Sequence, residues 1–412
     1  MVGLVHDITL QGENISAISD LRKKGRQSFL QQGLPTPKNE NWKYIKVREL
    51  NTDDFVFLTQ NSYDCVYKQP ILDIETYEIN FCNGKLVNHN LAISEGVEVM
   101  PLLQAIENKL TEKYLNQSFN MNNFPFAALN TTYLEQGLFI RVCENYQLDK
   151  PISLIYHTST NEKILSNIHN VIVAEPNAKL EIIEYYHHTS NIKSQYFNNI
   201  INEFFVDKNA SLNHYKVQNE AFKATHIALN CANIKENAKY ESFCFQKGAN
   251  LAQNETVVRL QEENASTCIN SAYNINGWAT VGTVTNVEHL HQSTYSKQLI
   301  KGVVDGNSKG VFKGKVHIAP NAVNTQGYQL HKAIILSDNS EVDVKPELEI
   351  FADDVKCSHG ATCGELDKDQ MFYLRSRGIS EENAKQILIK AFIEEPFSSI
   401  DNLNIKTWLQ SF

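Results

Sequence analysis

The sequence predicts a mainly β protein with a parallel β-helix core and a helical domain at each end. Phrases built around Asn-Ala recur along the middle of the chain at spacings of 27 to 32 residues. Long strand-like segments lie between these phrases, whereas both ends of the chain show helical patterns instead. Fixed periods of roughly 20–50 residues are typical of repeat architectures, in which each unit buries its inner face only by stacking on its neighbours.

The N-terminal domain is expected over residues 1–137 and begins with a helix. Ile18 and Leu21 belong to an apolar face with the 3.6-residue period of an amphipathic helix. Gly33 and Pro35 end this helix, because glycine and proline are the usual residues after a helical C-terminus.

The rest of this domain is expected to mix short elements. Trp42 and Tyr44 lie in a segment that we expect to dock against the body of the protein. Short apolar bursts separated by Asn and Asp predict short strands within residues 51–100. Leu102–Leu115 is expected to be a helix, and the Asn-rich stretch Phe119–Pro125 a loop.

The core is expected over residues 138–364, with one tight turn in each repeat. Asparagine tolerates the left-handed backbone conformation, and a small alanine after it allows neighbouring turns to stack. The predicted turn residues are Asn177, Asn209, Asn237, Asn264 and Asn321, at separations of 32, 28, 27 and 57 residues, with a weaker copy at Asn339. The last large separation is close to two periods.

Long strand candidates with little proline fill the intervals between these turns. They are His169–Ala174, Leu180–His187, Tyr196–Val206, Thr225–Ile234 and Thr280–Val287. Two such strands and two turns make up about 30 residues, which is one coil of a β-helix. An antiparallel β-sandwich is the alternative, but Asn-Gly hairpin signals occur only at Asn83–Gly84 and Asn276–Gly277.

The C-terminal domain is expected over residues 365–412 and is helical again. Asp367 and Ser380 are suited to cap the first two helices, and Pro396 ends the second. This second helix carries an apolar stripe made of Ala384, Ile387, Leu388, Ala391 and Phe392. The stripe fits either a core contact or a surface for a partner.

Composition excludes several classes of function. A formal net charge of −9 argues against a general nucleic-acid binder, which would show basic patches. No apolar run approaches the roughly 20 residues of a membrane span, and the first residues lack the pattern of a secretory signal, so we expect a cytoplasmic protein. Six of the eight cysteines are scattered and are expected to be small buried residues rather than members of a disulfide framework.

Common catalytic motifs are missing from the sequence. There is no phosphate-binding G-x-x-x-x-G-K-[ST], no G-x-G-x-x-G after a strand, no G-x-S-x-G and no H-E-x-x-H. His187–His188 and His289 with His291 are the remaining histidine groups. His289 and His291 would share one face of a strand and could hold a metal, although exposed polar positions are the simpler interpretation.

The stretch Phe351–Gly364 concentrates residues that bind metals. If Val355–His359 is extended, Cys357 and His359 point to the same face. A thiolate beside an imidazole suits iron, zinc or an iron–sulfur species, but a closed structural zinc site needs four ligands. Together with Cys363 the stretch supplies at most three, so it is either half of an interface site or an ordinary buried Cys with a structural His.

Several ordered stretches of this sequence resemble the SufB/SufD family of iron–sulfur cluster assembly proteins. They are Gly33–Thr36 with Lys38 and Glu40, Trp42–Tyr44, Asp353–Thr362 (DDVKCSHGAT), Phe372–Gly378 (FYLRSRG) and the tail helix. The resemblance covers nearly the whole chain. SufB proteins carry a cysteine within the FYxRxRG segment, where this chain has Leu374, so the resemblance is to the SufD branch.

This resemblance implies a right-handed parallel β-helix and a set of partners. It implies a complex of one SufB, two SufC and one SufD, in which the ends of two β-helices pair and the C-terminal helices bind the SufC ATPase. An isolated chain would form a homodimer. The residues implied in partner binding are Phe372, Tyr373, Arg375, Arg377, Ile387, Leu388 and Phe392.

The resemblance also implies a function. Cys357 and His359 would contact iron or a nascent cluster transiently at the SufB interface, with no cofactor bound tightly. Cys363 is not part of the family pattern. The expected protein is a non-catalytic scaffold subunit that assists iron delivery, and the alternatives are a stand-alone metal-binding protein or a carbohydrate-active β-helix enzyme.

Overall fold

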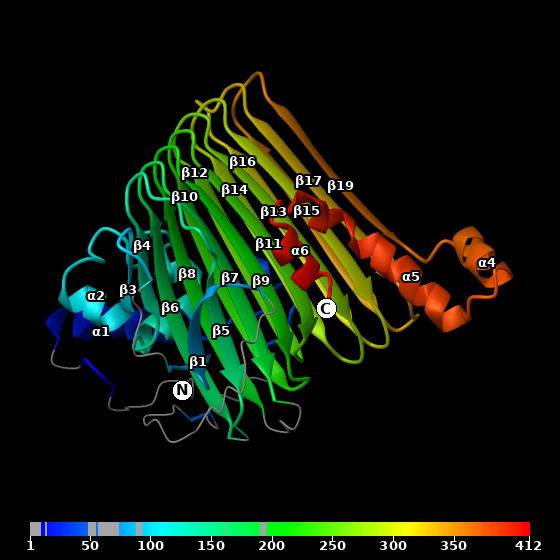
Figure 1. Cartoon of the computed structure of the whole chain (residues 1–412), viewed down its shortest axis with the longest axis horizontal. Coiled ribbons are helices and arrows are strands. Elements are labelled where there is room, and N and C mark those ends of the chain that lie inside the picture. Colours follow the sequence, from blue (N-terminus) through cyan, green and yellow to red (C-terminus); the bar gives the residue numbers. More distant parts are fainter. Residues whose placement is uncertain are drawn as a thin grey trace.

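Two parallel sheets wound into a β-helix make up most of the computed structural model (Figure 1). The structure describes residues 10–12, 15–47, 55–56, 74–87, 93–160, 162–189 and 195–412. Successive strands of the core alternate between the sheets, so each coil contributes one strand to each. Sheet A has the order β18-β16-β14-β12-β10-β8-β6-β4-β3, and sheet B has the order β19-β17-β15-β13-β11-β9-β7-β5-β1-β2.

The strands of the coils are mostly ten or eleven residues long. Those of sheet A are β4 (Leu138–Val142), β6 (Ile164–Ala174), β8 (Tyr196–Val206), β10 (Ala224–Ile234), β12 (Leu251–Leu260), β14 (Thr280–His289), β16 (Lys309–Ile318) and β18 (Glu341–Ile350). Those of sheet B are β5 (Ile152–Thr158), β7 (Lys179–His188), β9 (Ser211–Glu220), β11 (Lys239–Gly248), β13 (Ser266–Ile275), β15 (Tyr295–Val304), β17 (Gln326–Ile335) and β19 (Lys356–Gly364). The predicted parallel β-helix is confirmed, and all five strand candidates lie within these strands.

Strand pairing rules out the β-sandwich alternative. Within each sheet the core strands pair in parallel with the strand one coil away, for example β8 with β6 and β10. Among the described strands, antiparallel pairing occurs only between β1 (Tyr77–Cys82) and β2 (Lys85–Leu86) and between β3 (Val97–Pro101) and β4. The β1–β2 hairpin turns at Asn83–Gly84, where both residues have positive φ as a two-residue hairpin requires.

A column of left-handed residues marks one turn of each coil. Their φ values lie between 53° and 61°, and they are Asn145, Asn177, Asn209, Asn237, Asn264, Ser293, Asn324 and Asp354. Side-chain amides link neighbouring turns, as in the 3.1 Å bond from Asn209 Nδ2 to Asn177 Oδ1. The alanine that follows four of these asparagines is fully buried in the stack.

Two of the predicted turn residues are wrong. The left-handed residue of the later coil is Asn324, three residues beyond Asn321, and Ser293 supplies the turn that the 57-residue gap had hidden. Asn339 lies between β17 and β18, at the opposite end of the coil, so it does not belong to this column. Serine and aspartate also tolerate this conformation when the surrounding stack fixes it.

The N-terminal helices cover the outer face of sheet A at the first coils. Helix α1 (Ser16–Gln32) crosses α3 (Pro125–Thr132) so closely that a Cβ on Gly25 would lie 2.6 Å from a backbone nitrogen of α3. The short 3₁₀ helix η1 (Glu40–Trp42) then docks, and its Trp42 packs on Phe126 with ring centroids 5.1 Å apart. The predicted docking segment is therefore confirmed.

The remaining N-terminal elements are shorter than expected. Helix α2 covers only Leu102–Glu107 and continues as turns, instead of a helix to Leu115. The predicted loop at 119–125 contains the 3₁₀ helix η3 (Met121–Asn123). Strands β1, β2 and β3 account for part of the short strands expected within 51–100, and the remainder of that region is largely outside the described residues.

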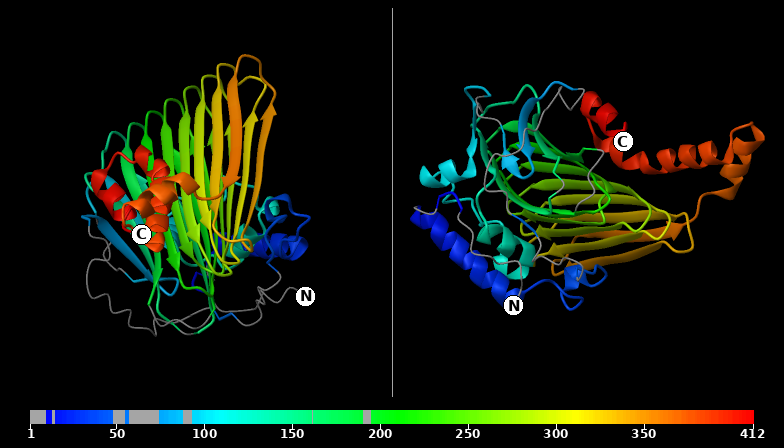
Figure 2. Two further views of the ribbon diagram at one scale, coloured as in Figure 1. Left: turned by 90° about the vertical axis from the view of Figure 1, so that its right-hand side faces the viewer. Right: turned by 90° about the horizontal axis from the view of Figure 1, so that it is seen from below.

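The C-terminal helices form an arm and a cover. Helix α4 (Lys368–Ser376) lies at the tip of the arm, and α5 (Glu381–Ile393) leads back to the body (Figure 2). The 3₁₀ helix η4 (Glu395–Ser399) and α6 (Leu403–Leu409) then cover the outer face of sheet B, where Phe397 packs on Phe243. None of the described helices has the length and apolar content needed to cross a membrane.

Candidate functional site: the open end of the solenoid and its helical arm

Among the described residues, the last coil of the solenoid has no neighbouring strand on one side. Strands β18 and β19 are the final strands of their sheets. No residue of either strand is buried, whereas β10, in the middle of sheet A, is buried at every position. Phe351, in the turn after β18, is 61% exposed. An uncovered parallel edge with apolar residues beside it is a surface on which another strand can pair.

The metal-binding candidates lie on this last strand. Cys357 pairs in register with Gly327 of β17, and His359 pairs with Gln329, whose side chain is buried inside the solenoid. Residues two apart on a strand share a face, so Cys357 and His359 both lie on the face turned toward the interior. Cys357 is half-buried and His359 is exposed, since no further coil covers it.

Cys363 continues the same row. It is six residues beyond Cys357 on β19 and is exposed. Burial raises the pKa of the Cys357 and Cys363 thiols, so both are protonated at neutral pH in the isolated chain. No three His, Cys, Asp or Glu side chains of the described residues converge on a point that could hold a metal ion. The described residues of this row therefore do not form a complete metal site by themselves.

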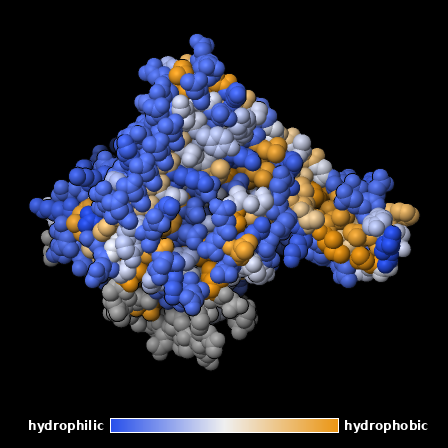
Figure 3. All heavy atoms as spheres, turned by 45° about the horizontal axis from the view of Figure 1, so that its top comes forward, coloured by the Kyte–Doolittle hydropathy of each residue, from blue (hydrophilic) through white to orange (hydrophobic). Residues whose placement is uncertain are grey.

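The arm carries exposed aromatic and aliphatic side chains. Phe372 is 75% exposed and Tyr373 is 56% exposed on α4, while Ile387 on α5 is 46% exposed. Figure 3 shows apolar residues gathered over this protruding part of the molecule. Helix α4 has no buried residue at all, so its apolar side chains do not stabilise the fold of this chain.

The other predicted partner residues have intramolecular contacts of different kinds. Arg375 forms an ion pair with Glu381 at 3.2 Å, and the Arg377 guanidinium lies 5.1 Å from the Tyr373 ring centroid. Phe392 is half-buried beneath the Lys301 ammonium group, which lies 4.4 Å from the centre of its ring.

The apolar stripe of α5 divides between core and surface. Of the predicted stripe only Ala384 is buried, and the other buried residues of α5, Ile389 and Ile393, lie outside the stripe and pack on sheet B. Ile387 and Ala391 point to solvent, and Leu388 is intermediate. The expected core contact is therefore confirmed for Ala384, whereas the partner surface stays a prediction for the exposed residues.

The His289–His291 pair does not form a metal site. Strand β14 ends at His289, so His291 lies beyond the strand and does not share its face. His289 is fully buried, and its two ring nitrogens each lie 2.8 Å from a hydroxyl, of Thr294 and Ser296. It is a core histidine with both nitrogens satisfied.

A buried polar network inside the solenoid was not anticipated from the sequence. Glu184 is fully buried and accepts hydrogen bonds from the Tyr186 hydroxyl (2.7 Å) and the Asn202 amide (3.1 Å), and His214 Nε2 lies 2.8 Å away. Burial by itself raises the pKa of Glu184, but the contact with His214 and nearby positive charge outweigh it and lower the pKa to about 2. A buried carboxylate is tolerated here because every contact favours its charged form.

Further buried pairs extend this network. Glu220 lies 3.0 Å from His226, and Glu203 lies 2.9 Å from His169. The ammonium group of Lys216, also fully buried, donates to Asn254 at 2.6 Å. One pattern could have pointed to these groups: polar residues alternate with apolar ones in strands that are packed on both faces.

The cysteine expectations hold in part. Cys231 is buried, and Cys143, Cys244 and Cys268 are unpaired and half-buried. Cys82, in contrast, is disulfide-bonded, against the expectation of unpaired thiols. Cys65 lies outside the described residues.

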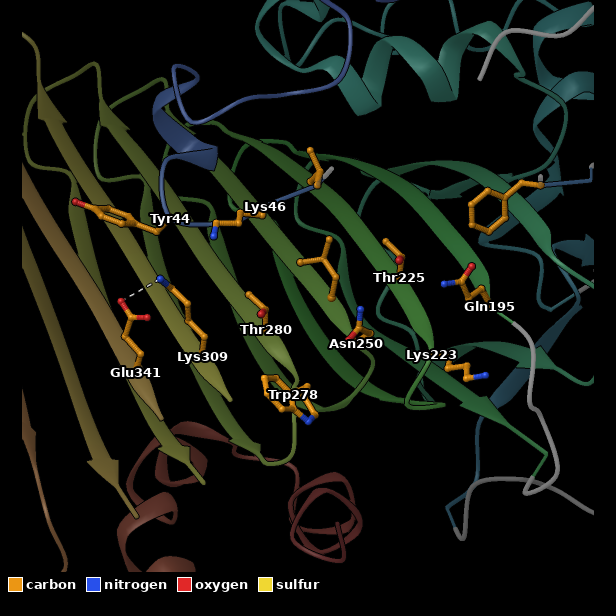
Figure 4. Close-up of a pocket in the computed structure, with 13 residues that line it drawn as sticks. Tyr44, Lys46, Gln195, Lys223, Thr225, Asn250, Trp278, Thr280, Lys309 and Glu341 are labelled. Carbon is orange, nitrogen blue, oxygen red and sulfur yellow. Dashed lines mark ion pairs between the residues drawn. The ribbon is translucent and has the colours of Figure 1, made fainter. Parts of the chain in front are cut away.

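A pocket of about 350 Å³ lies between the docking segment and the outer face of sheet A (Figure 4). Tyr44 and Lys46 line one side, and Trp278 lies at its rim with 68% of its surface exposed. Lys309 is paired with Glu341 at 3.1 Å. The described lining residues include no nucleophile–base pair, so the pocket supports no catalytic proposal.

Comparison with known proteins agrees with this geometry. Residues 156–392 match the family model described as "SUF system FeS cluster assembly, SufBD core domain", and residues 6–154 match "SufBD protein N-terminal region". The chain is 30% identical to the iron–sulfur cluster assembly protein SufD of Escherichia coli, over 92% of this chain and 88% of the relative.

Two further relatives give the same result. A SufBD family protein of Synechocystis is 30% identical over 89% of this chain and 84% of the relative. SufD of Bacillus subtilis is 27% identical over 73% of this chain and 69% of the relative. The chain therefore belongs to the SufBD family of the SUF iron–sulfur cluster assembly system, in which it is SufD-like.

Proposed function

We propose that this chain is a non-catalytic scaffold subunit that pairs with a SufB protein, binds the SufC ATPase and assists iron delivery to a nascent cluster in the cytoplasm. The observation that carries the proposal is the open end of the solenoid. There, an unpaired coil places Cys357 and His359 on an incomplete ligand row. Family membership gives the general role in SUF cluster assembly.

The open end fits a second β-helix. Its two edge strands leave backbone hydrogen-bonding groups unpaired, and the interior of the last coil is exposed. A SufB protein of the same fold would cover this surface by placing its own edge strands against β18 and β19. In the absence of SufB, a second copy of this chain would do so and give a homodimer.

The arm fits the SufC ATPase. Phe372, Tyr373 and Ile387 expose apolar area without a role in the fold, and Arg375 and Arg377 add charge around it. Interfaces are enriched in aromatic residues and arginine in this way. Leu388 and Phe392 complete the surface where the arm joins the body.

His359 is the residue we assign to the metal contact. Its exposure at the open end leaves the imidazole accessible to a partner, and Cys357 lies beside it on the same face. Both thiol and imidazole are ligands for iron and iron–sulfur species. The contact is transient, because this chain supplies too few ligands to hold the ion alone.

The arm also provides a route for coupling. Helix α5 is anchored to sheet B by Ile389 and Ile393, so force applied to α4 by SufC is transmitted to the solenoid. Movement of SufC on binding ATP would then change the SufB interface. Crosslinks between Phe372→Cys and SufC that do not change with nucleotide would count against this coupling.

Co-purification tests the proposal. A tagged chain expressed with SufB and SufC should retain both partners. Phe372→Ala with Ile387→Ala should release SufC and keep SufB, and Phe351→Glu should do the reverse. Gln386→Ala, also exposed on α5, is the matched control. Purification of the chain alone with stoichiometric metal would support a stand-alone metal-binding protein instead.

A further inference from the structure

Two histidines on neighbouring strands face each other on the outer surface of sheet B. His157 of β5 and His187 of β7 are direct register partners. Their Nδ1 atoms lie 3.2 Å apart, and the ring centroids are 4.4 Å apart with an interplanar angle of 42°. The pair lies near the carboxyl ends of the two strands, on the opposite face from the buried Tyr156 and Tyr186.

The geometry of this pair matches two ligands of one metal ion. A Zn²⁺ ion about 2.05 Å from each Nδ1 would give an N–Zn–N angle of about 103° across the 3.2 Å separation, close to the tetrahedral angle of about 109°. The ring centroids would separate from 4.4 Å to about 5 Å, which small side-chain rotations can provide. We propose that His157 and His187 bind a divalent transition-metal ion, and that this site is separate from the row at the open end.

The hydrogen bonding of the described His187 ring is compatible with this role. Two neutral imidazoles can place only one proton between their Nδ1 atoms, so the contact between these two atoms is at most one hydrogen bond in the metal-free chain. His187 Nε2 is buried and has no hydrogen-bond partner among the described residues. Metal binding through Nδ1 would fix the tautomer of both rings, with the proton on Nε2.

Two ligands to this proposed site come from the described part of the chain. Cys82 of β1 lies next to His157 in the same row, but its sulfur is in a disulfide and is not counted as a ligand. If the ion takes only these two imidazoles from the protein, water or an external ligand fills its other positions, as in sites that exchange metal or substrate. Imidazole ligands suit zinc, copper, iron and nickel, and we therefore expect binding of several first-row ions.

Calorimetric titration with Zn²⁺ tests the site in the full chain. The background variant Cys357→Ser/His359→Ala/Cys363→Ser removes the open-end row, so this test is independent of the proposed function. We expect one Zn²⁺ per chain in the background. His157→Gln or His187→Gln should weaken Zn²⁺ binding by at least about 10–100-fold. Loss of a residue that only supports a metal ligand already has an effect of this size. His188→Gln, one residue away with its Nδ1 on the Thr189 carbonyl, should bind as the background does.

X-ray absorption on the Zn²⁺-loaded background protein tests the ligands without altering either histidine. Two imidazole ligands with the remaining ligands oxygen would support the proposal. The absence of Zn²⁺ binding in the background, sulfur or oxygen ligands alone, or unchanged affinity in both folded glutamine variants would overturn it.

Discussion

The middle of the solenoid and its open end are built from the same kind of coil, but inward-facing polar side chains are buried in the middle and exposed at the open end. In the middle, Glu184 and Lys216 are fully buried and each makes short contacts with neighbouring side chains. At the open end, His359 and Cys363 share the inward face of their strand but are exposed. We infer that a polar interior needs a next coil to complete its contacts, which the described residues do not supply at the open end.

Acid should have the largest effect on the buried interior of the solenoid. The pKa of buried His289 is about 3 and that of His331 about 4, because burial disfavours the charged ring. The unfolded chain binds these protons first, so the free energy of unfolding should fall as pH drops below about 6.5. Glu184, with its pKa lowered to about 2, loses its contribution from about pH 4.5 downward.

Urea unfolding at a series of pH values measures this decline. In a plot of the free energy of unfolding against pH, His289→Gln should reduce the slope between about pH 6.5 and 4. A free energy of unfolding that is constant from pH 7 to 4 would contradict the assigned protonation states.

Removing one partner of the buried network should have the next largest effect on the free energy of unfolding. Glu184→Ala leaves His214 and the Tyr186 hydroxyl without their buried acceptor, which should cost about 3–5 kcal/mol in the free energy of unfolding. The matched change at the open end is Glu349→Ala, which breaks exposed contacts with Lys315 and His317. That change should cost only about 0–1 kcal/mol. Equal costs at the two sites would remove the contrast between the regions.

A change in the turn column should have a moderate effect. Asn209→Ala places alanine at a φ of 58° and removes the side-chain bond to Asn177. We expect a loss of about 1–2 kcal/mol, measured by the shift in the denaturant midpoint at constant m-value. Asn209→Gly keeps the backbone conformation accessible and should cost less than alanine. A larger loss for glycine would show that the left-handed conformation is not the main requirement.

The smallest effect on stability should come from His359, the proposed metal-contact residue. His359→Ala at the open end should change the free energy of unfolding by less than about 0.5 kcal/mol, because the side chain is exposed. The same variant should lower the yield of iron–sulfur cluster formed with SufB and SufC, measured by visible absorption. Ser358→Ala, on the other face of β19, is the control. Normal cluster yield in His359→Ala would remove this residue from the mechanism.

The repeat architecture could be predicted because its turns are local. A left-handed residue favours asparagine within one short phrase, so Asn177, Asn209, Asn237 and Asn264 could be recognised directly. Ser293 could not, since only the stack of neighbouring turns makes serine acceptable there.

Part of the candidate site could also be predicted from the sequence. The shared face of Cys357 and His359 follows from a two-residue spacing on an extended strand, and register with β17 agrees with it. The buried network and the His157–His187 pair were missed, because their members are roughly one coil apart in sequence and only strand register brings them together. A search for polar residues that recur at the coil period, about 30 residues, would have found both.

The most direct test of the central claim is the composition and mass of the complex formed by this chain, SufB and SufC. Light scattering after size exclusion should show one assembly that contains all three proteins. Phe351→Glu at the open end should remove SufB from it while SufC stays bound. The claim is contradicted if the chain does not associate with SufB, or if Phe351→Glu leaves the SufB content unchanged.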